Sequence, residues 1–228
     1  MIDLIARRET ASSGWSFLAA IFMICSSVVE TKAGEPPPGF SRLADVAPDI
    51  EQDMRYAGSD NFTGNPVPGY RAPDCWLRTE AAQALAAVQA EAQRRGFSLV
   101  VYDCYRPQRA VEAFVLWSRN PDQSTKSDYF PHIDKRKLFA RGYIAQRSSH
   151  STGLAVDIGV PGWDFGSHFD YFDRSSWTKN RVTPEARRHR EALVNVMRRY
   201  GFINYPREWW HFTYGDAERA PILDAEID

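Results

Sequence analysis

Apolar residues recur at helical spacing in three stretches of the chain. The longest covers residues 78–95 (RTEAAQALAAVQAEAQRR), with Thr79 as its expected N-cap and two arginines followed by a glycine at its end. A shorter stretch covers residues 109–117. A third covers residues 183–200, where Thr183 is the expected cap and a proline takes the first helical position. We expect a helix over each stretch.

Short runs of β-branched and aromatic residues lie between and after these helices. Strands are expected over residues 98–103, 154–160, 202–205 and 208–214, while residues 50–56 fit a short strand or a turn. A strand, then helices, then several strands predict an α+β fold. We therefore expect a single domain with a central antiparallel sheet and flanking helices, and no parallel βαβ repeat is visible.

The composition is that of an ordinary globular protein. The 228 residues are 43% hydrophobic and 25% charged, which is enough for one sizeable core without a second domain. Lys and Arg number 28 against 29 Asp and Glu, so the net charge is −1. This balance gives no reason to expect nucleic acid or another polyanion as a partner.

The first part of the chain differs from the rest. Arg7 and Arg8 precede an apolar run over residues 15–29, which is short and interrupted by serines for a membrane span but suits a signal peptide. Residues 31–33 offer a small-x-small cleavage site. We expect residues 1–33 to be a signal peptide, with an uncleaved anchor as the alternative. The mature protein is then periplasmic or secreted and has no membrane partner.

The rest of the chain divides by composition. Residues 34–44 contain a Pro-Pro-Pro-Gly run and are expected to form a stiff, extended spacer. Residues 45–217 carry the expected helices and strands and are expected to form the folded domain. Residues 218–228 are expected to be a polar tail.

The expected export bears on the oxidation state of the cysteines. Removal of the signal peptide takes Cys25 with it and leaves Cys75 and Cys104 as an even pair in an oxidising compartment. We expect a disulfide between them. Two buried free thiols are the alternative, and they become the better interpretation if the N-terminal segment is not a signal.

Two short motifs supply the ligands that a catalytic zinc requires. His150 and Asp157 lie seven residues apart, and His211 ends the sequence Glu-Trp-Trp-His. Two imidazoles and a carboxylate give three protein donors and leave a fourth position open for water. Glu208 lies three residues before His211 and could handle the proton of that water.

The Glu-Trp-Trp-His motif at residues 208–211 can act at one centre only if its backbone is irregular. Residues 208–214 are expected to form a strand, and residues three apart in a strand point to opposite faces. Glu208 and His211 converge on one centre only if Trp209 and Trp210 bend or bulge the chain. Each motif also occurs by chance, so spacing alone indicates no more than a candidate metal site.

Taken together, the motifs resemble those of a known enzyme family. Ser-x-His-x-x-Gly-x-Ala-x-Asp at residues 148–157, with Glu-x-Trp-His at residues 208–211, is similar to the pattern of the D-alanyl-D-alanine dipeptidases of the vancomycin-resistance type. These belong to a wider group of zinc peptidases with D,D-carboxypeptidases and the hedgehog signalling domain. Further matching segments are residues 55–64, 103–107 and 166–173.

The resemblance implies one zinc ion per chain, bound by His150, Asp157 and His211 in a cleft on the sheet. It gives Glu208 the role of general base and acid, which takes a proton from the attacking water and delivers it to the leaving amine. Arg106 matches the arginine that faces the developing oxyanion. The implied reaction is hydrolysis of the small-molecule dipeptide D-Ala-D-Ala to two D-alanines.

The remaining matched residues concern the arginine and the substrate. Asp103 is expected to hold Arg106 in place, and a purely structural salt bridge between the two is the alternative. Ser148 matches a residue that contacts the dipeptide, while Asp170 and Tyr56 match groups that receive its free ammonium. An acid in that position favours a dipeptidase, because a longer chain would present an amide there. An Asp170 that faces solvent would instead favour a carboxypeptidase or endopeptidase.

Two alternative functions stay open. One is a zinc D,D-carboxypeptidase that acts on peptidoglycan stem peptides. The other is a non-catalytic, zinc-stabilised binding module, against which Glu208 argues because a structural site has no use for a carboxylate beside an open coordination position. The cysteine pair and the export segment are not features of the cytoplasmic resistance enzymes. They point to recycling or scavenging of dipeptide released in peptidoglycan turnover.

Overall fold

The computed structural model describes residues 34–228, so the expected signal peptide, residues 1–33, lies outside the described part of the chain. In chain order, the strands and α-helices of this part are β1 (Phe40–Arg42), α1 (Leu43–Val46), β2 (Glu51–Gln52), β3 (Trp76–Arg78), α2 (Thr79–Arg94), β4 (Val100–Asp103), α3 (Gln108–Arg119), α4 (Lys126–Tyr129), β5 (Ala155–Gly159), α5 (Pro184–Arg199), β6 (Phe202–Asn204) and β7 (His211–Tyr214). Short 3-10 helices cover Arg55–Ala57, Lys135–Lys137, Ser149–Thr152 and Arg174–Ser176.

A five-stranded sheet forms the centre of the domain, in the order β2-β4-β5-β7-β6. Its middle strand, β5, is buried along its whole length. The pairs β4–β5, β5–β7 and β6–β7 are antiparallel, as the sequence predicts, whereas β2 and β4 run parallel. A parallel pair needs a long crossover connection, and the segment that contains α2 provides it. The α+β class with flanking helices is confirmed.

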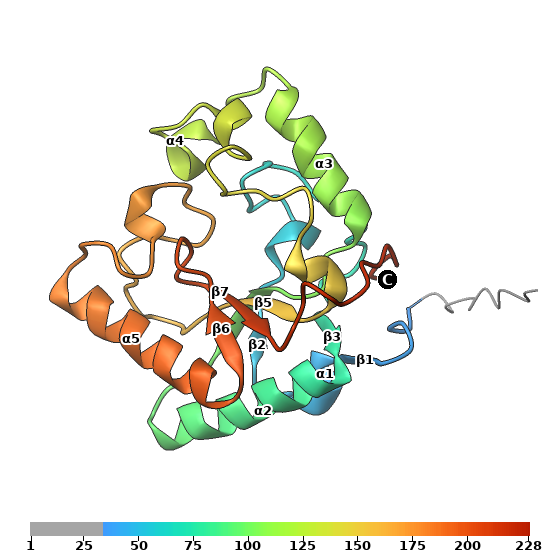
Figure 1. Cartoon of the computed structure of the whole chain (residues 1–228), viewed down its shortest axis with the longest axis vertical. Coiled ribbons are helices and arrows are strands. Elements are labelled where there is room, and N and C mark those ends of the chain that lie inside the picture. Colours follow the sequence, from blue (N-terminus) through green and yellow to red (C-terminus); the bar gives the residue numbers. More distant parts are fainter. Residues whose placement is uncertain (1–33) are drawn as a thin grey trace, which may run out of the picture. The chain divides into compact units, whose positions relative to one another are not determined.

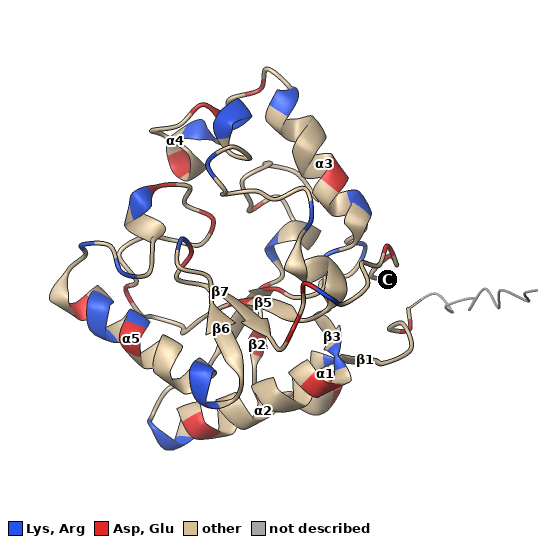
Figure 2. Cartoon of the chain, in the orientation of Figure 1, with Lys and Arg blue, Asp and Glu red and all other residues tan. Residues whose placement is uncertain are grey.

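Helices cover both sides of this sheet. Figure 1 shows α2 and α5 next to each other along one side, while α3 and α4 lie toward the other side. Acidic and basic residues are interspersed along α2 and α5, as Figure 2 shows. Between residues 34 and 228, no helix combines the length and the apolar character that a membrane crossing requires.

The helix starts test the capping predictions. Thr183 caps α5 as expected, because its side-chain oxygen accepts a hydrogen bond from the backbone N–H of Ala186 at 3.1 Å. Thr79 is instead the first residue inside α2, so its prediction as N-cap is wrong. Its hydroxyl lies 2.9 Å from that of Ser41 and 3.3 Å from the carbonyl oxygen of Gly39. Contacts with a distant segment have thus replaced the local cap.

The folded domain extends further at both ends than composition suggests. Strand β1 lies inside the expected spacer and pairs with β3 as a two-stranded antiparallel sheet. At the other end, Ile227 is fully buried and its carbonyl oxygen accepts hydrogen bonds from the backbone N–H groups of Arg71 and Ala72. The side chain of Asp224 also forms an ion pair with Arg109 at 3.0 Å. The expected spacer and the expected polar tail therefore both contain residues that pair or pack with the rest of the domain.

Gly153 follows the 3-10 helix Ser149–Thr152 and packs against Phe40 of β1. Gly153 has a φ of 75°, in the left-handed region that favours glycine. A Cβ atom at this position would collide with the ring of Phe40. The position therefore requires glycine for two independent reasons.

We expect Gly153→Ala to lower the free energy of unfolding by about 2–4 kcal/mol, from left-handed strain and overpacking together. Gly96→Ala is the matched control, because Gly96 has a φ of 84° but open space around its Cβ position. Strain alone should cost that variant about 1 kcal/mol. Urea denaturation of both variants measures the difference, and equal losses would contradict the packing argument.

Candidate active site

One row of residues across the sheet supplies three of the site's side chains. Asp103 of β4 lies opposite Asp157 of β5, which in turn lies opposite His211 of β7. The register of β4 shifts between Val101 and Asp103, so the strand contains an irregularity at Tyr102. Such a bulge re-aims a side chain by adding one residue to one strand. Here it brings Asp103 opposite Asp157.

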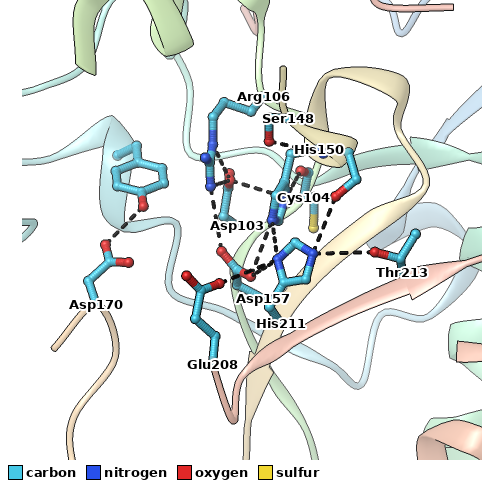
Figure 3. Close-up of polar contacts among 12 residues, drawn as sticks. Asp103, Cys104, Arg106, Ser148, His150, Asp157, Asp170, Glu208, His211 and Thr213 are labelled. Atoms are coloured by element: carbon cyan, nitrogen blue, oxygen red, sulfur yellow. Dashed lines mark hydrogen bonds and ion pairs between the residues drawn. The ribbon is translucent and has the colours of Figure 1, made fainter. Parts of the chain in front are cut away.

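The 3-10 helix Ser149–Thr152 places His150 above this row. Its backbone N–H donates to the side-chain oxygen of Ser148 at 3.3 Å, and its carbonyl oxygen accepts from the backbone N–H of Arg106 at 3.2 Å. The ring is buried and points toward Asp157 and His211, as Figure 3 shows. The two motifs that are separate in sequence therefore meet, as predicted.

Three donor atoms form a tight triangle. Nε2 of His150 lies 3.2 Å from Oδ1 of Asp157 and 3.0 Å from Nδ1 of His211, and the last two atoms are 3.0 Å apart. Nitrogen and oxygen ligands at about 2.0–2.1 Å from a tetrahedral zinc ion lie about 3.3 Å from each other. The residues therefore fit a zinc ion in both donor type and spacing, with room for a fourth ligand on the cavity side.

Hydrogen bonds on the far side of each ring prepare these donors. Nδ1 of His150 lies 2.7 Å from the carbonyl oxygen of Cys104, which can only accept, so this nitrogen carries the proton and leaves Nε2 free. Nε2 of His211 lies 3.3 Å from the hydroxyls of Ser149 and Thr213, which leaves Nδ1 facing Asp157.

The charge states also suit a metal. Burial favours the neutral form of Asp157, but its contacts with His150 and His211 outweigh this effect and hold the pKa of the carboxyl well below its usual value. Burial lowers the pKa of His211, although Asp157 opposes the shift. An ionised carboxylate beside a neutral imidazole is the state that metal binding needs.

Glu208 lies before β7 rather than in it, so the predicted strand over residues 208–214 is wrong at its start. The chain turns at Trp209 and Trp210, and the N–H of Trp209 donates to the carbonyl oxygen of Ser176 at 3.0 Å. This turn provides the bend that lets Glu208 and His211 converge, since Oε2 of Glu208 comes within 3.9 Å of Nδ1 of His211. Burial, followed by the charges of Asp157 and Asp170, raises the pKa of Glu208 well above its usual value.

Arg106 pairs with one acid and faces another. Its Nε and Nη2 lie 2.9 and 2.8 Å from Oδ2 of Asp103, and Nη2 lies 3.6 Å from Oδ2 of Asp157. The guanidinium also packs over the rings of Tyr56 and Phe114. The salt bridge with Asp103 thus exists, and it holds the arginine beside the three donors rather than away from them.

Asp170 lies inside the same cavity, on the side opposite the histidines. It is 4% exposed, and the hydroxyl of Tyr56 donates to its Oδ2 at 2.8 Å. Among residues 34–228, no basic side chain lies within ion-pair distance of Asp170, although the positive charge of Arg106 acts on it from further away and lowers its pKa somewhat. Burial and then the charge of Asp157 raise its pKa well above the usual value. Its φ of 60° marks a backbone conformation that non-glycine residues seldom adopt.

A cavity of about 1000 Å³ is lined by the three donor residues together with Arg106, Glu208 and Asp170. Aromatic side chains form part of its wall, and the exposed side chain of Ile203 also lines it. Ser148 lines the cavity, as its predicted contact with substrate requires. The residues that the sequence indicated are therefore brought together at one concave surface. That surface holds the carboxyls of Asp157, Asp170 and Glu208 and the guanidinium of Arg106.

The two cysteines lie behind the site. Cys75 and Cys104 are buried, with their sulfur atoms at bonding distance and their Cα atoms 5.3 Å apart. They meet across a sequence separation of 29 residues.

Sequence reasoning missed three residues that support the site. The hydroxyl of Tyr70 donates to Oδ1 of Asp103 at 2.6 Å, a contact between residues 33 apart that has no local signal. Ser149 lies inside the recognised motif and could have been found there. Thr213 lies two residues after His211 in β7, so its side chain is on the same face of the strand.

Comparison with known proteins agrees with this geometry. The family model described as D-ala-D-ala dipeptidase, of peptidase family M15, matches residues 38–227. The chain is 36% identical over 186 residues to a D-alanyl-D-alanine dipeptidase of Enterococcus faecium, which covers 78% of this chain and 92% of the relative. It is 38% identical over 197 residues to one of Streptomyces coelicolor, with coverage of 83% and 96%.

Among solved structures, the chain is similar to the LdcB LD-carboxypeptidase, with a TM-score of 0.45 and 21% identity over 79% of this chain and 69% of that chain. The family model covers nearly all of the described residues, and the sequence relatives cover more than three quarters of the chain. The chain therefore belongs to the D-Ala-D-Ala dipeptidase family of the M15 peptidases.

Proposed function

We propose that this protein is a zinc-dependent dipeptidase that hydrolyses D-Ala-D-Ala to two D-alanines. The observation that carries the proposal is the triangle of His150, Asp157 and His211, which lies in one cavity with a general base and a fixed cation. The relatives from Enterococcus faecium and Streptomyces coelicolor both bear the name D-alanyl-D-alanine dipeptidase.

The triangle of donors supports zinc as the cofactor. A zinc ion held there would act as a Lewis acid and activate water for attack on the amide carbon. Glu208 accepts the proton of the attacking water and then delivers it to the leaving amine. Its raised pKa suits this exchange, because a carboxyl that holds a proton more tightly than usual is a better acceptor and can return the proton near neutral pH.

Arg106 provides the fixed positive charge. Its contacts with Asp103 leave the guanidinium pointing at the donors, where it stabilises the negative charge that develops on the carbonyl oxygen of the substrate. A cation held in advance by a buried acid needs little reorganisation during the reaction.

Asp170 and Tyr56 support a dipeptide as the substrate. A buried carboxyl without a basic partner is unfavourable in its charged form, and the ammonium group of a free dipeptide would supply the missing charge. A stem peptide presents an uncharged amide at the same place. The burial of Asp170 therefore favours the dipeptidase over the D,D-carboxypeptidase, and Glu208 continues to argue against a non-catalytic binding module.

We further propose that the mature protein is periplasmic or secreted and contains a disulfide between Cys75 and Cys104. The proximity of the two sulfur atoms supports the disulfide, and the apolar run over residues 15–29 supports export. An exported enzyme meets the dipeptide outside the cytoplasm, so its role would be recycling or scavenging during peptidoglycan turnover.

Mutation can distinguish the proposed role of Glu208 as a base from that of His211 as a zinc ligand. Glu208→Ala should bind zinc with unchanged stoichiometry but lower kcat by about 100- to 10,000-fold, because only proton transfer is lost. His211→Ala should lose the metal, because two protein donors hold zinc poorly. Metal analysis and steady-state kinetics on D-Ala-D-Ala measure both effects. An active Glu208→Ala protein would overturn the mechanism.

Substrate choice tests the ammonium site. We expect the enzyme to hydrolyse D-Ala-D-Ala. Its kcat/KM for the N-acetyl form should be lower than that for the dipeptide by about 1000-fold or more, since the acylated nitrogen leaves the Asp170 carboxyl unpaired. Asp170→Asn should lower kcat/KM for the dipeptide by about 100-fold and reduce the preference for the dipeptide over its N-acetyl form. Tyr56→Phe should lower kcat/KM for the dipeptide by about tenfold. Activity on the acylated substrate alone would identify a carboxypeptidase instead.

The oxidation state of the cysteines is open to direct measurement. Mature protein isolated from the export compartment should take up no alkylating agent under denaturing conditions without reductant and two equivalents after reduction. Intact-protein mass spectrometry distinguishes the two results and also gives the N-terminal residue. Two alkylated thiols before reduction would contradict the disulfide.

A further inference from the structure

The segment from Asp103 to Arg106 contacts the candidate metal centre through Asp103, Cys104 and Arg106. The carboxylate of Asp103 holds Arg106, and its Oδ2 also lies 3.3 Å from Nδ1 of His150. The carbonyl oxygen of Cys104 accepts the hydrogen bond of that same Nδ1 at 2.7 Å. This short piece of backbone therefore sets both the orientation of a zinc ligand and the position of the cation.

After Asp103, which pairs with Asp157 in the sheet, few backbone contacts hold this segment in place. The N–H of Tyr105 donates to the carbonyl oxygen of Trp76 at 2.9 Å, and that of Arg106 donates to the carbonyl oxygen of His150 at 3.2 Å. Pro107 follows and has no N–H to donate. One of these two bonds leads back to the very histidine that the segment positions, so it cannot serve as an independent anchor.

Cys75 offers a firmer attachment. Its backbone N–H donates to Oε1 of Gln52 at 3.0 Å, and its carbonyl oxygen accepts from the N–H of Leu43 at 2.8 Å. Both cysteines are almost completely buried. A bond between the sulfurs ties Cys104, and with it the carbonyl that faces His150, to backbone that is held by Gln52 of β2 and Leu43 of α1.

We propose that the Cys75–Cys104 disulfide is a positioning crosslink for the metal centre, because it holds the Cys104 carbonyl against Nδ1 of His150. The carbonyl keeps the proton on Nδ1, and the lone pair on Nε2 is thereby directed at the ion. Without the crosslink, Cys104 moves more freely, the hydrogen bond weakens and zinc affinity falls. The inference rests on the zinc site and the disulfide of the proposed function.

Reduction of the folded protein provides the test. Tris(2-carboxyethyl)phosphine converts the disulfide to two thiols and is itself oxidised to the phosphine oxide with oxygen from water. Competition with a chromophoric chelator then gives the Kd for zinc before and after reduction, while alkylation confirms the thiols and circular dichroism confirms the fold. We expect reduction to raise the Kd about tenfold or more, the usual effect of losing a partner that orients a metal-binding histidine.

Two variants separate positioning from general stability. Cys75→Ser should show the raised Kd from the start and should not respond to the phosphine. Val88→Ala is the matched control, since Val88 is fully buried in α2 and is not among the residues that line the cavity. It should lower the melting temperature yet bind zinc as tightly as the unaltered chain. All measurements are made at a temperature at which each protein is folded.

Two results would overturn the proposal. The first is an unchanged Kd in folded protein whose two thiols are shown to be free. The second is a rise in Kd for Val88→Ala as large as that for Cys75→Ser, which would make the effect one of stability. The measurement uses no substrate, so failure of the dipeptidase proposal does not affect it, and zinc binding that survives His211→Ala would identify an error in the site itself.

Discussion

The contact of Asp157 with two histidines is the interaction on which the rest of the site depends. A carboxylate in the middle strand of a buried sheet is costly unless it is paired on both oxygens. Oδ1 faces His150 and His211, while Oδ2 faces Arg106 at 3.6 Å. One buried charge thus fixes the ligands on one side and the cation on the other, and its low pKa keeps it ionised.

Three carboxyls in one cavity differ in behaviour because their surroundings differ. Asp157 is ionised through its histidine contacts, whereas burial raises the pKa of Glu208 and of Asp170. In the proposed mechanism, the raised pKa suits Glu208 as a proton acceptor and Asp170 as a partner for the ammonium group of the substrate. In that mechanism, separation of pKa values by environment would let the same chemical group hold a metal, move a proton and bind an amine.

The sequence predicts well where local periodicity decides. Helix α5 starts where Thr183 and the following proline indicate, because a cap is a contact between near neighbours. Helix α2 exists as expected, but Thr79 does not cap it, since Ser41 competes for its hydroxyl. Residues 218–228 look polar, yet Ile227 is buried against a segment more than 150 residues earlier. Such contacts leave no period in the sequence.

The sequence by itself determined the chemistry of this protein: two histidines, an aspartate and a glutamate in motifs whose order is specific to one family. Only the tertiary structure decided how they meet. The bulge at Tyr102 sets Asp103 opposite Asp157, and the turn at Trp209 carries Glu208 toward the ligands. Both depend on strand register and on contacts between distant segments, which the spacing of residues along one chain does not encode.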